Sequence, residues 1–94
     1  MKKSILATIT YTVDSKHPDF YNPPINEVLS YSDVYTFDMD YYDNEDVENY
    51  IKSDLRLIAG GGYNSKHIHN VSFDFTTDRG KIEKFNAELK ARFA

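Results

Sequence analysis

Cysteine is absent from this chain of 94 residues. Its absence excludes a disulfide framework and thiolate chemistry, and it agrees with the reducing conditions of the cytoplasm, where we expect the protein to be located. Long hydrophobic runs are missing as well, because the apolar start at Ile5 and Leu6 soon alternates with threonines. We therefore expect no membrane-spanning segment and no membrane contact, and residues 1–94 are expected to form one domain.

Sequence motifs of enzymes are also missing. No spacing of serine, histidine and aspartate matches a nucleophile motif. The run Gly60-Gly61-Gly62 has the composition of a phosphate-binding loop, but such a loop opens a helix, whereas these glycines follow an amphipathic segment and are expected to end it. We expect no cofactor and no enzymatic activity from these patterns.

Basic side chains are scarce in the middle of the chain. Residues 14–54 contain eleven acids and two lysines, whereas residues 55–94 contain seven bases and four acids, within a formal net charge of −4. Separated charge of this kind steers charged partners toward a protein. An acidic middle does not suit contacts with nucleic-acid phosphates. The expected partner is therefore a protein with a basic surface, with no direct binding of nucleic acid.

Three segments alternate apolar and polar side chains with the period of a strand that has one buried face. They cover residues 5–13, 35–42 and 67–76. In the second segment the expected buried side is Tyr35, Phe37, Met39 and Tyr41, and the polar side is Thr36, Asp38, Asp40 and Tyr42. In the third segment one side is His67, His69, Val71, Phe73 and Phe75, and the other is Ile68, Asn70, Ser72, Asp74 and Thr76.

Apolar residues spaced by three and four predict two main helices. The first is capped by Asp43 or Asn44 and ends at the glycines, and its apolar stripe is Val47, Tyr50, Ile51, Leu55 and Ile58. The second follows a cap at Thr77 or Asp78, and its stripe is Ile82, Phe85, Leu89 and Phe93. Residues 14–33 are predicted to be a long connection, with one or two helical turns after Pro24 that include Ile25, Val28 and Leu29.

These elements predict an α+β fold in the order β-(short α)-β-α-β-α. The sheet is expected to be small, three-stranded and mainly antiparallel, with the first strand in the centre. Because every strand has one polar face, both main helices are expected to pack on the same face. The predicted buried set is Phe37, Met39, Val71, Phe73, Ile51, Leu55, Phe85 and Leu89.

Acidic residues are concentrated where the second strand leads into the first main helix. The usual interpretation of such a group is a solvated surface, and the alternative is an acidic surface that binds a partner. Tyrosine is enriched among interface anchors, so Tyr42 is expected to make the short-range contact, and Tyr35 and Tyr41 are further candidates. The predicted partner-binding residues are Asp38, Asp40, Tyr42, Asp43, Glu45, Asp46 and Glu48.

The segment His67-Ile68-His69 is the sharpest small motif. Two imidazoles on one side of a strand have a spacing that a single metal ion can use, and a third ligand would have to come from Asp14, His17 or Asp19. The alternative is a pair of solvated or hydrogen-bonded histidines at the end of the sheet. We take that alternative and assign no metal ligand, although a small metal-binding protein or enzyme centred on His67 and His69 is the second functional hypothesis.

In size and composition the whole chain resembles the small inhibitors encoded by phages and mobile elements, anti-CRISPR proteins among them, which are single-domain, acidic and free of cysteine. This resemblance implies a small acidic protein-binding module that blocks a basic, nucleic-acid-handling protein, and it assigns no functional residue. A third interpretation is a subunit that forms a homodimer through an exposed edge strand.

Overall fold

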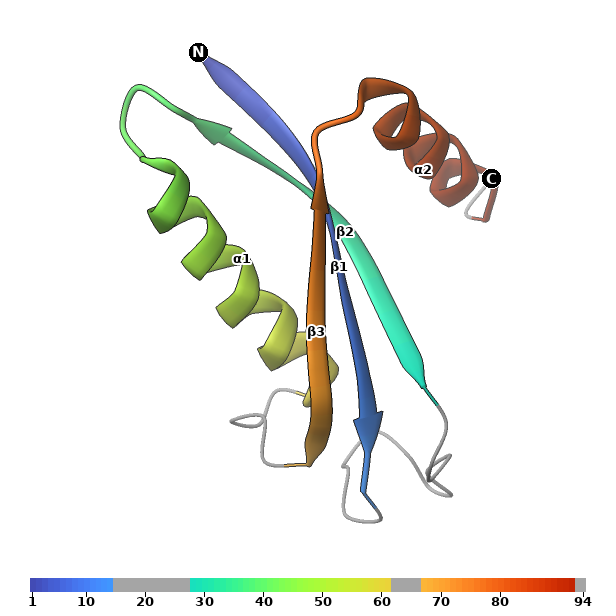
Figure 1. Ribbon diagram of the computed structural model, residues 1–94. Helices are drawn as coiled ribbons and strands as arrows, with labels where there is room; N and C mark the ends of the chain where they lie inside the picture. Colours follow the sequence, from blue (N-terminus) through green and yellow to red (C-terminus); the bar gives the residue numbers. More distant parts are fainter. Residues whose placement is uncertain (15–27, 62–66, 93–94) are drawn as a thin grey trace.

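The computed structural model describes residues 1–14, 28–61 and 67–92. Along these residues the order is β1 (Lys2–Val13), β2 (Leu29–Asp38), α1 (Asn44–Ala59), β3 (Ile68–Thr76) and α2 (Arg79–Arg92) (Figure 1). The predicted α+β class is confirmed, with a single three-stranded sheet and two helices. None of the described helices is long and apolar enough to cross a membrane.

Strand β1 is the centre of the sheet, as predicted. The strand order is β2-β1-β3, and β1 is antiparallel to both neighbours. Its β-branched and apolar residues alternate with polar ones, so one face of the strand is buried and the other remains partly exposed. The buried residues of β1 are Ile5, Ala7, Ile9, Tyr11 and Val13.

Helix α1 covers this apolar face of β1. Four residues spaced by four, Val47, Ile51, Leu55 and Ala59, are buried against it. Asp43 begins the helix, because its Oδ1 accepts a hydrogen bond from the backbone N–H of Asp46 at 2.8 Å. Gly61 follows its end with a φ of 69°, the left-handed conformation that glycine adopts easily. The glycine run therefore ends a helix, as the sequence indicates.

Strand β2 is displaced along the chain from its predicted position. It begins at Leu29, so Val28 and Leu29 are not helical, whereas residues 24–27 of the predicted short helix lie outside the described residues. It ends at Asp38 and not at Tyr42, because Asp38 Oδ1 accepts a hydrogen bond from the backbone N–H of Asp40 at 3.0 Å. A side chain that bonds the backbone two residues ahead favours a turn over a continued strand.

Strand β3 contains a bulge that the alternation of its residues does not predict. Thr10 pairs with Ser72, but Thr12 pairs with His69, so β3 has one residue more than β1 over this interval. Asn70 has a φ of 54° and donates from Nδ2 to Thr12 Oγ1 at 3.1 Å. The prediction that the two histidines share a side with Val71 and Phe73 is therefore wrong, because the bulge turns Ile68 into the core.

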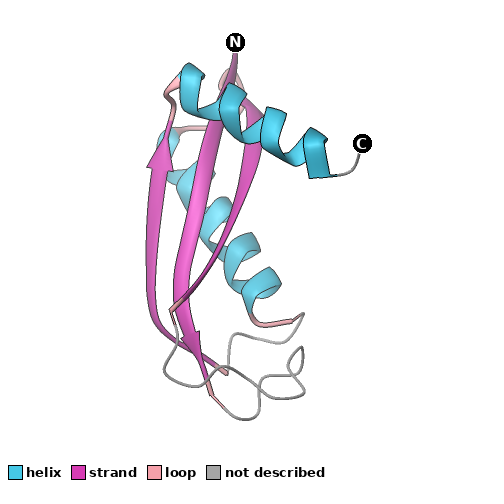
Figure 2. Cartoon of the chain, turned by 90° about the vertical axis from the view of Figure 1, so that its right-hand side faces the viewer, coloured by secondary structure: helices cyan, strands magenta, loops and turns pink. Residues whose placement is uncertain are grey.

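The two helices lie on opposite faces of the sheet, which corrects the expectation that they share one (Figure 2). Lys81 of α2 lines a hollow with Leu6 and Thr8, on the face of β1 that points away from α1. The alternation in the sequence predicts a polar face here. However, Leu6 and Val34 are cross-strand partners there and are half-buried, so the face has an apolar centre that a second helix can cover.

Helix α2 is much less buried than α1. Only Ile82 is buried among its described side chains, Phe85 is half-buried, and Leu89 is 39% exposed. Phe85 and Leu89 thus do not join Ile51 and Leu55 in a single core, and Phe93 lies outside the described residues. The other members of the predicted buried set, Phe37, Met39, Val71 and Phe73, are partly buried against the α1 side of the core.

Candidate functional site

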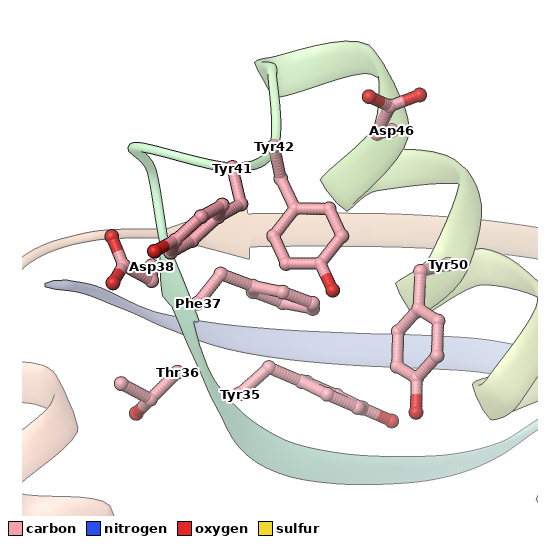
Figure 3. A pocket seen from close by; sticks show the side chains of 8 residues that line it. All are labelled: Tyr35, Thr36, Phe37, Asp38, Tyr41, Tyr42, Asp46 and Tyr50. Carbon is pink, nitrogen blue, oxygen red and sulfur yellow. The ribbon is translucent and has the colours of Figure 1, made fainter.

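A hollow lies between the end of β2 and the first half of α1 (Figure 3). Its volume is about 710 Å³, and most of its wall consists of aromatic rings. Strand β2 and the turn after it supply one side, and α1 supplies the other. The lining residues are Tyr35, Thr36, Phe37, Asp38, Tyr41, Tyr42, Asp46 and Tyr50. We call this region the aromatic hollow.

The rings around Phe37 are arranged at steep angles to one another. The ring centroids of Phe37 and Tyr42 are 6.0 Å apart with planes at 75°, and those of Phe37 and Tyr50 are 5.6 Å apart with planes at 82°. Tyr35 stacks beside Phe37 with centroids 6.4 Å apart. These are favourable aromatic contacts, which hold the rings in place. Even so, Tyr42 is 50% exposed and Tyr50 is 58% exposed, so much of their surface is available to a partner.

One tyrosine of the hollow is tied to α1 by its hydroxyl group. Tyr35 Oη donates a hydrogen bond to Asp54 Oδ2 at 2.5 Å. Burial of the ring, and then this hydrogen bond and the negative charge of Asp54, raise the pKa of Tyr35 well above its ordinary value. Tyr35 therefore stays neutral and serves as a fixed wall of the hollow.

No family model, curated protein or solved structure matches this chain. The assignment of a function consequently depends on the geometry and chemistry of the described residues.

The structure brings three of the predicted partner-binding residues together. Asp38, Tyr42 and Asp46 all line the aromatic hollow, although they come from a strand end, a turn and a helix. In the described part of the chain, no ion pair involves the Asp46 carboxylate. Asp46 lies one helical turn before Tyr50 and lines the rim of the hollow, where its carboxylate points away from the rings (Figure 3).

Two predicted acids, Asp38 in the hollow and Asp40 beside it, already contact a positive charge. The terminal ammonium nitrogen of Met1 is 3.3 Å from Asp38 Oδ1 and 2.8 Å from Asp40 Oδ2. These pairs are exposed, so their electrostatic energy is small. Asp40 does not line the hollow, because the strand has already ended at Asp38.

The remaining predicted residues are separated from the hollow. Asp43 caps α1, and Glu45 is an exposed acid in the first helical turn, where it suits the positive end of the helix dipole. Glu48 lines a different hollow together with Lys3 and Phe75. The acidic cluster of the sequence is therefore divided between at least two surfaces of the molecule.

Phe37 and Tyr50 are the functional candidates that sequence reasoning missed. Both were assigned to the core because they fall on the apolar side of a strand and a helix. Val47, Ile51 and Leu55 already complete the buried stripe of α1, and Tyr50 projects beside that stripe. Asp46 and Tyr50 are four residues apart on a predicted helix, and this spacing could have indicated that the two side chains belong to one surface.

The two histidines of the second hypothesis contact the same carboxylate. His67 Nδ1 is 3.2 Å from Asp14 Oδ1, and His69 Nε2 is 3.1 Å from Asp14 Oδ2. Asp14 thus accepts from both rings and fastens the end of β1 to the start of β3. Within residues 1–14, 28–61 and 67–92, no group of three or more acidic, histidine or cysteine side chains is arranged to hold a metal ion. The other two candidate ligands, His17 and Asp19, lie outside the described residues.

Proposed function

We propose that this protein is a small binding module whose aromatic hollow accepts a basic segment of a partner protein. The observation that carries the proposal is the combination of exposed tyrosine rings with two carboxylates in one concave surface. Tyrosine supplies a large contact area at low conformational cost and is enriched among residues that dominate binding energy. A hollow that exposes several such rings is more specific evidence than the acidic composition alone.

Charge supports a basic partner. Asp38 and Asp46 line the hollow, and none of its described lining residues is a lysine or an arginine. Residues 14–54, which include β2 and most of α1, have eleven acids against two lysines. Complementary charge accelerates the encounter of two proteins and selects among partners. A partner with a neutral or acidic surface would gain nothing from these features.

We infer that such a module acts as an inhibitor in the cytoplasm, in the manner of the small phage and mobile-element proteins that the composition resembles. Proteins that handle nucleic acid present basic surfaces, which an acidic module can cover. The bound module would then exclude the phosphate backbone from that surface. This proposal needs neither a cofactor nor a homodimer, because the hollow is formed within one chain.

Charge removal at the hollow tests the proposal. A partner is first captured from the host lysate and identified, and its association with the module is then followed by surface plasmon resonance at low and high salt. The variant Asp38→Asn with Asp46→Asn removes two charges that line the hollow. The matched control, Asp74→Asn with Glu88→Gln, removes two charges from exposed residues that do not line it.

The hollow variant is expected to associate several-fold more slowly than the parent at low salt, and the difference should shrink at high salt. Salt screens exposed charges, with a Debye length of ~8 Å at physiological ionic strength. The control variant is expected to associate at nearly the parent rate. Equal slowing of both variants would show that only the net charge matters, and the hollow would lose its role.

A further inference from the structure

We propose that the aromatic hollow is an arginine-binding site, in which the guanidinium group of a partner's arginine enters the corner formed by Phe37, Tyr42 and Tyr50 and stacks on one of these rings. The inference rests on the proposed function and adds the chemical identity of the group that enters the hollow. Neither the composition of the chain nor its charge distribution distinguishes arginine from lysine. The arrangement of the rings and of the hydrogen-bond acceptors beside them distinguishes arginine from lysine.

The rings of Phe37, Tyr42 and Tyr50 set the shape of the site. Tyr42 and Tyr50 each meet Phe37 at a steep angle, 75° and 82°, with centroids 6.0 Å and 5.6 Å away. Two ring planes that meet in this way form a corner, and a flat group can stack on one ring while its edge faces the other. Both tyrosines are at least half exposed, so an incoming side chain can reach this corner from solvent.

An acidic side chain at the rim of the rings supplies a hydrogen-bond acceptor. Asp46 lines the rim of the hollow with its carboxylate turned away from the rings (Figure 3), and this carboxylate is in no ion pair with the described residues. A guanidinium group is planar, weakly hydrated and carries five N–H donors, so it can stack on a ring and donate to a carboxylate at the same time. A lysine ammonium is a compact, strongly hydrated charge and cannot stack in the same way.

A quaternary ammonium group, such as trimethyl-lysine, is the other cation that aromatic sites recognise. It has no N–H donor. In this hollow it could stack on a ring but could not donate a hydrogen bond to the Asp46 carboxylate at the rim. Carboxylates at the rim of the ring cluster therefore favour arginine.

Synthetic peptides test this assignment. Capped hexa-arginine, capped hexa-lysine and a capped trimethyl-lysine peptide are titrated into the protein, and the aromatic resonances of the full chain are followed by nuclear magnetic resonance. Tyr42→Leu and Tyr50→Leu remove one ring each while retaining an apolar side chain, and a backbone amide spectrum confirms that each variant is folded. Tyr31→Leu is the matched control, since Tyr31 is an exposed tyrosine of β2 that does not line the hollow.

We expect hexa-arginine to shift the signals of Phe37, Tyr42 and Tyr50 and to bind at least about fivefold more tightly than either other peptide. Each hollow variant should lose most of this preference, and the control should keep it. Equal binding of arginine and lysine peptides at these rings would overturn the arginine assignment and leave the proposed basic partner intact. Tighter binding of the trimethyl-lysine peptide would overturn it as well. If no peptide shifts these signals, both the assignment and the proposed function fail.

Discussion

Tyr35 shows how one side chain serves both the fold and the hollow. Its ring stacks with Phe37, and its hydroxyl group joins β2 to α1 through Asp54. The folded protein thereby retains the phenolic proton at pH values where a tyrosine in the unfolded chain has lost it. The stability that comes from this difference is complete below the unfolded pKa of about 10 and is lost as the pH rises toward the higher folded pKa.

The first prediction concerns Tyr35→Phe. The variant should lose about 1 kcal/mol of unfolding free energy at neutral pH, the scale of one half-exposed hydrogen bond. Above pH 10 its stability should decline less steeply than that of the parent, because one raised tyrosine pKa has been removed. Urea unfolding at a series of pH values measures both effects. Tyr41→Phe is the control, since Tyr41 is 80% exposed. A decline identical to the parent's in Tyr35→Phe would refute the link between Tyr35 and alkaline stability.

The second prediction concerns the bulge residue Asn70. Its φ of 54° lies in the left-handed region, where a β-branched residue is strained. Asn70→Val should therefore destabilise the protein by ~1–2 kcal/mol more than Asn70→Gly, which also loses the hydrogen bond to Thr12 but accepts the backbone conformation. Denaturant unfolding of the two variants gives the difference. Equal stabilities would mean that the bulge is not maintained in solution.

The sequence predicted regular strands and helices, but not the positions where a single side chain changes the backbone. The alternation in residues 5–13 identifies the central strand because successive side chains of a strand point to opposite faces of the sheet. The turn at Asp38 and the bulge at Asn70 each depend on a polar side chain that bonds to a particular group in the folded chain. Tyr50 was misplaced for a related reason, since the helical period does not distinguish the edge of an apolar stripe from its centre.

At the scale of elements, α1 and α2 differ in how firmly they are held. Helix α1 buries Val47, Ile51, Leu55 and Ala59, whereas α2 buries only Ile82 among its described residues. Most helical stability in proteins comes from packing of an apolar face and not from intrinsic propensity. Both helices were predicted from their apolar spacing. The sequence did not predict which face of the sheet α2 covers. The half-buried pair Leu6 and Val34 lies on that face, which otherwise carries mainly serines and threonines.

The third prediction follows from this difference. Backbone amides in α2 should exchange with deuterium faster than those of Val47, Ile51 and Leu55 in α1, because α2 can open without exposing the core. Native-state hydrogen exchange measured residue by residue gives both sets of rates. Both helices are measured in one sample, so the global stability of the protein affects both sets of rates equally. Equally slow exchange in α2 and α1 would contradict the burial seen in the structure.

At the scale of the whole molecule, the sheet separates two surfaces with different composition. The aromatic hollow lies on the α1 side, and α2, with five basic residues against two acids, covers part of the other side. The hollow was only partly predictable. The sequence around the strand-to-helix turn indicated Asp38, Asp46 and Tyr42. That these residues line one hollow with Phe37 and Tyr50, while Glu48 lines another, depends on how α1 packs against β2.

Binding at the aromatic hollow is tested most directly by the affinity of a captured and identified partner for a variant with Tyr42→Ala and Tyr50→Ala. Tyr31→Ala is the matched control outside the hollow. We expect the double variant to remain folded and to bind at least about tenfold more weakly, mainly through a faster off-rate, because anchor residues govern dissociation. The control should bind like the parent. A folded double variant that binds within about twofold of the parent would show that the partner does not use the aromatic hollow.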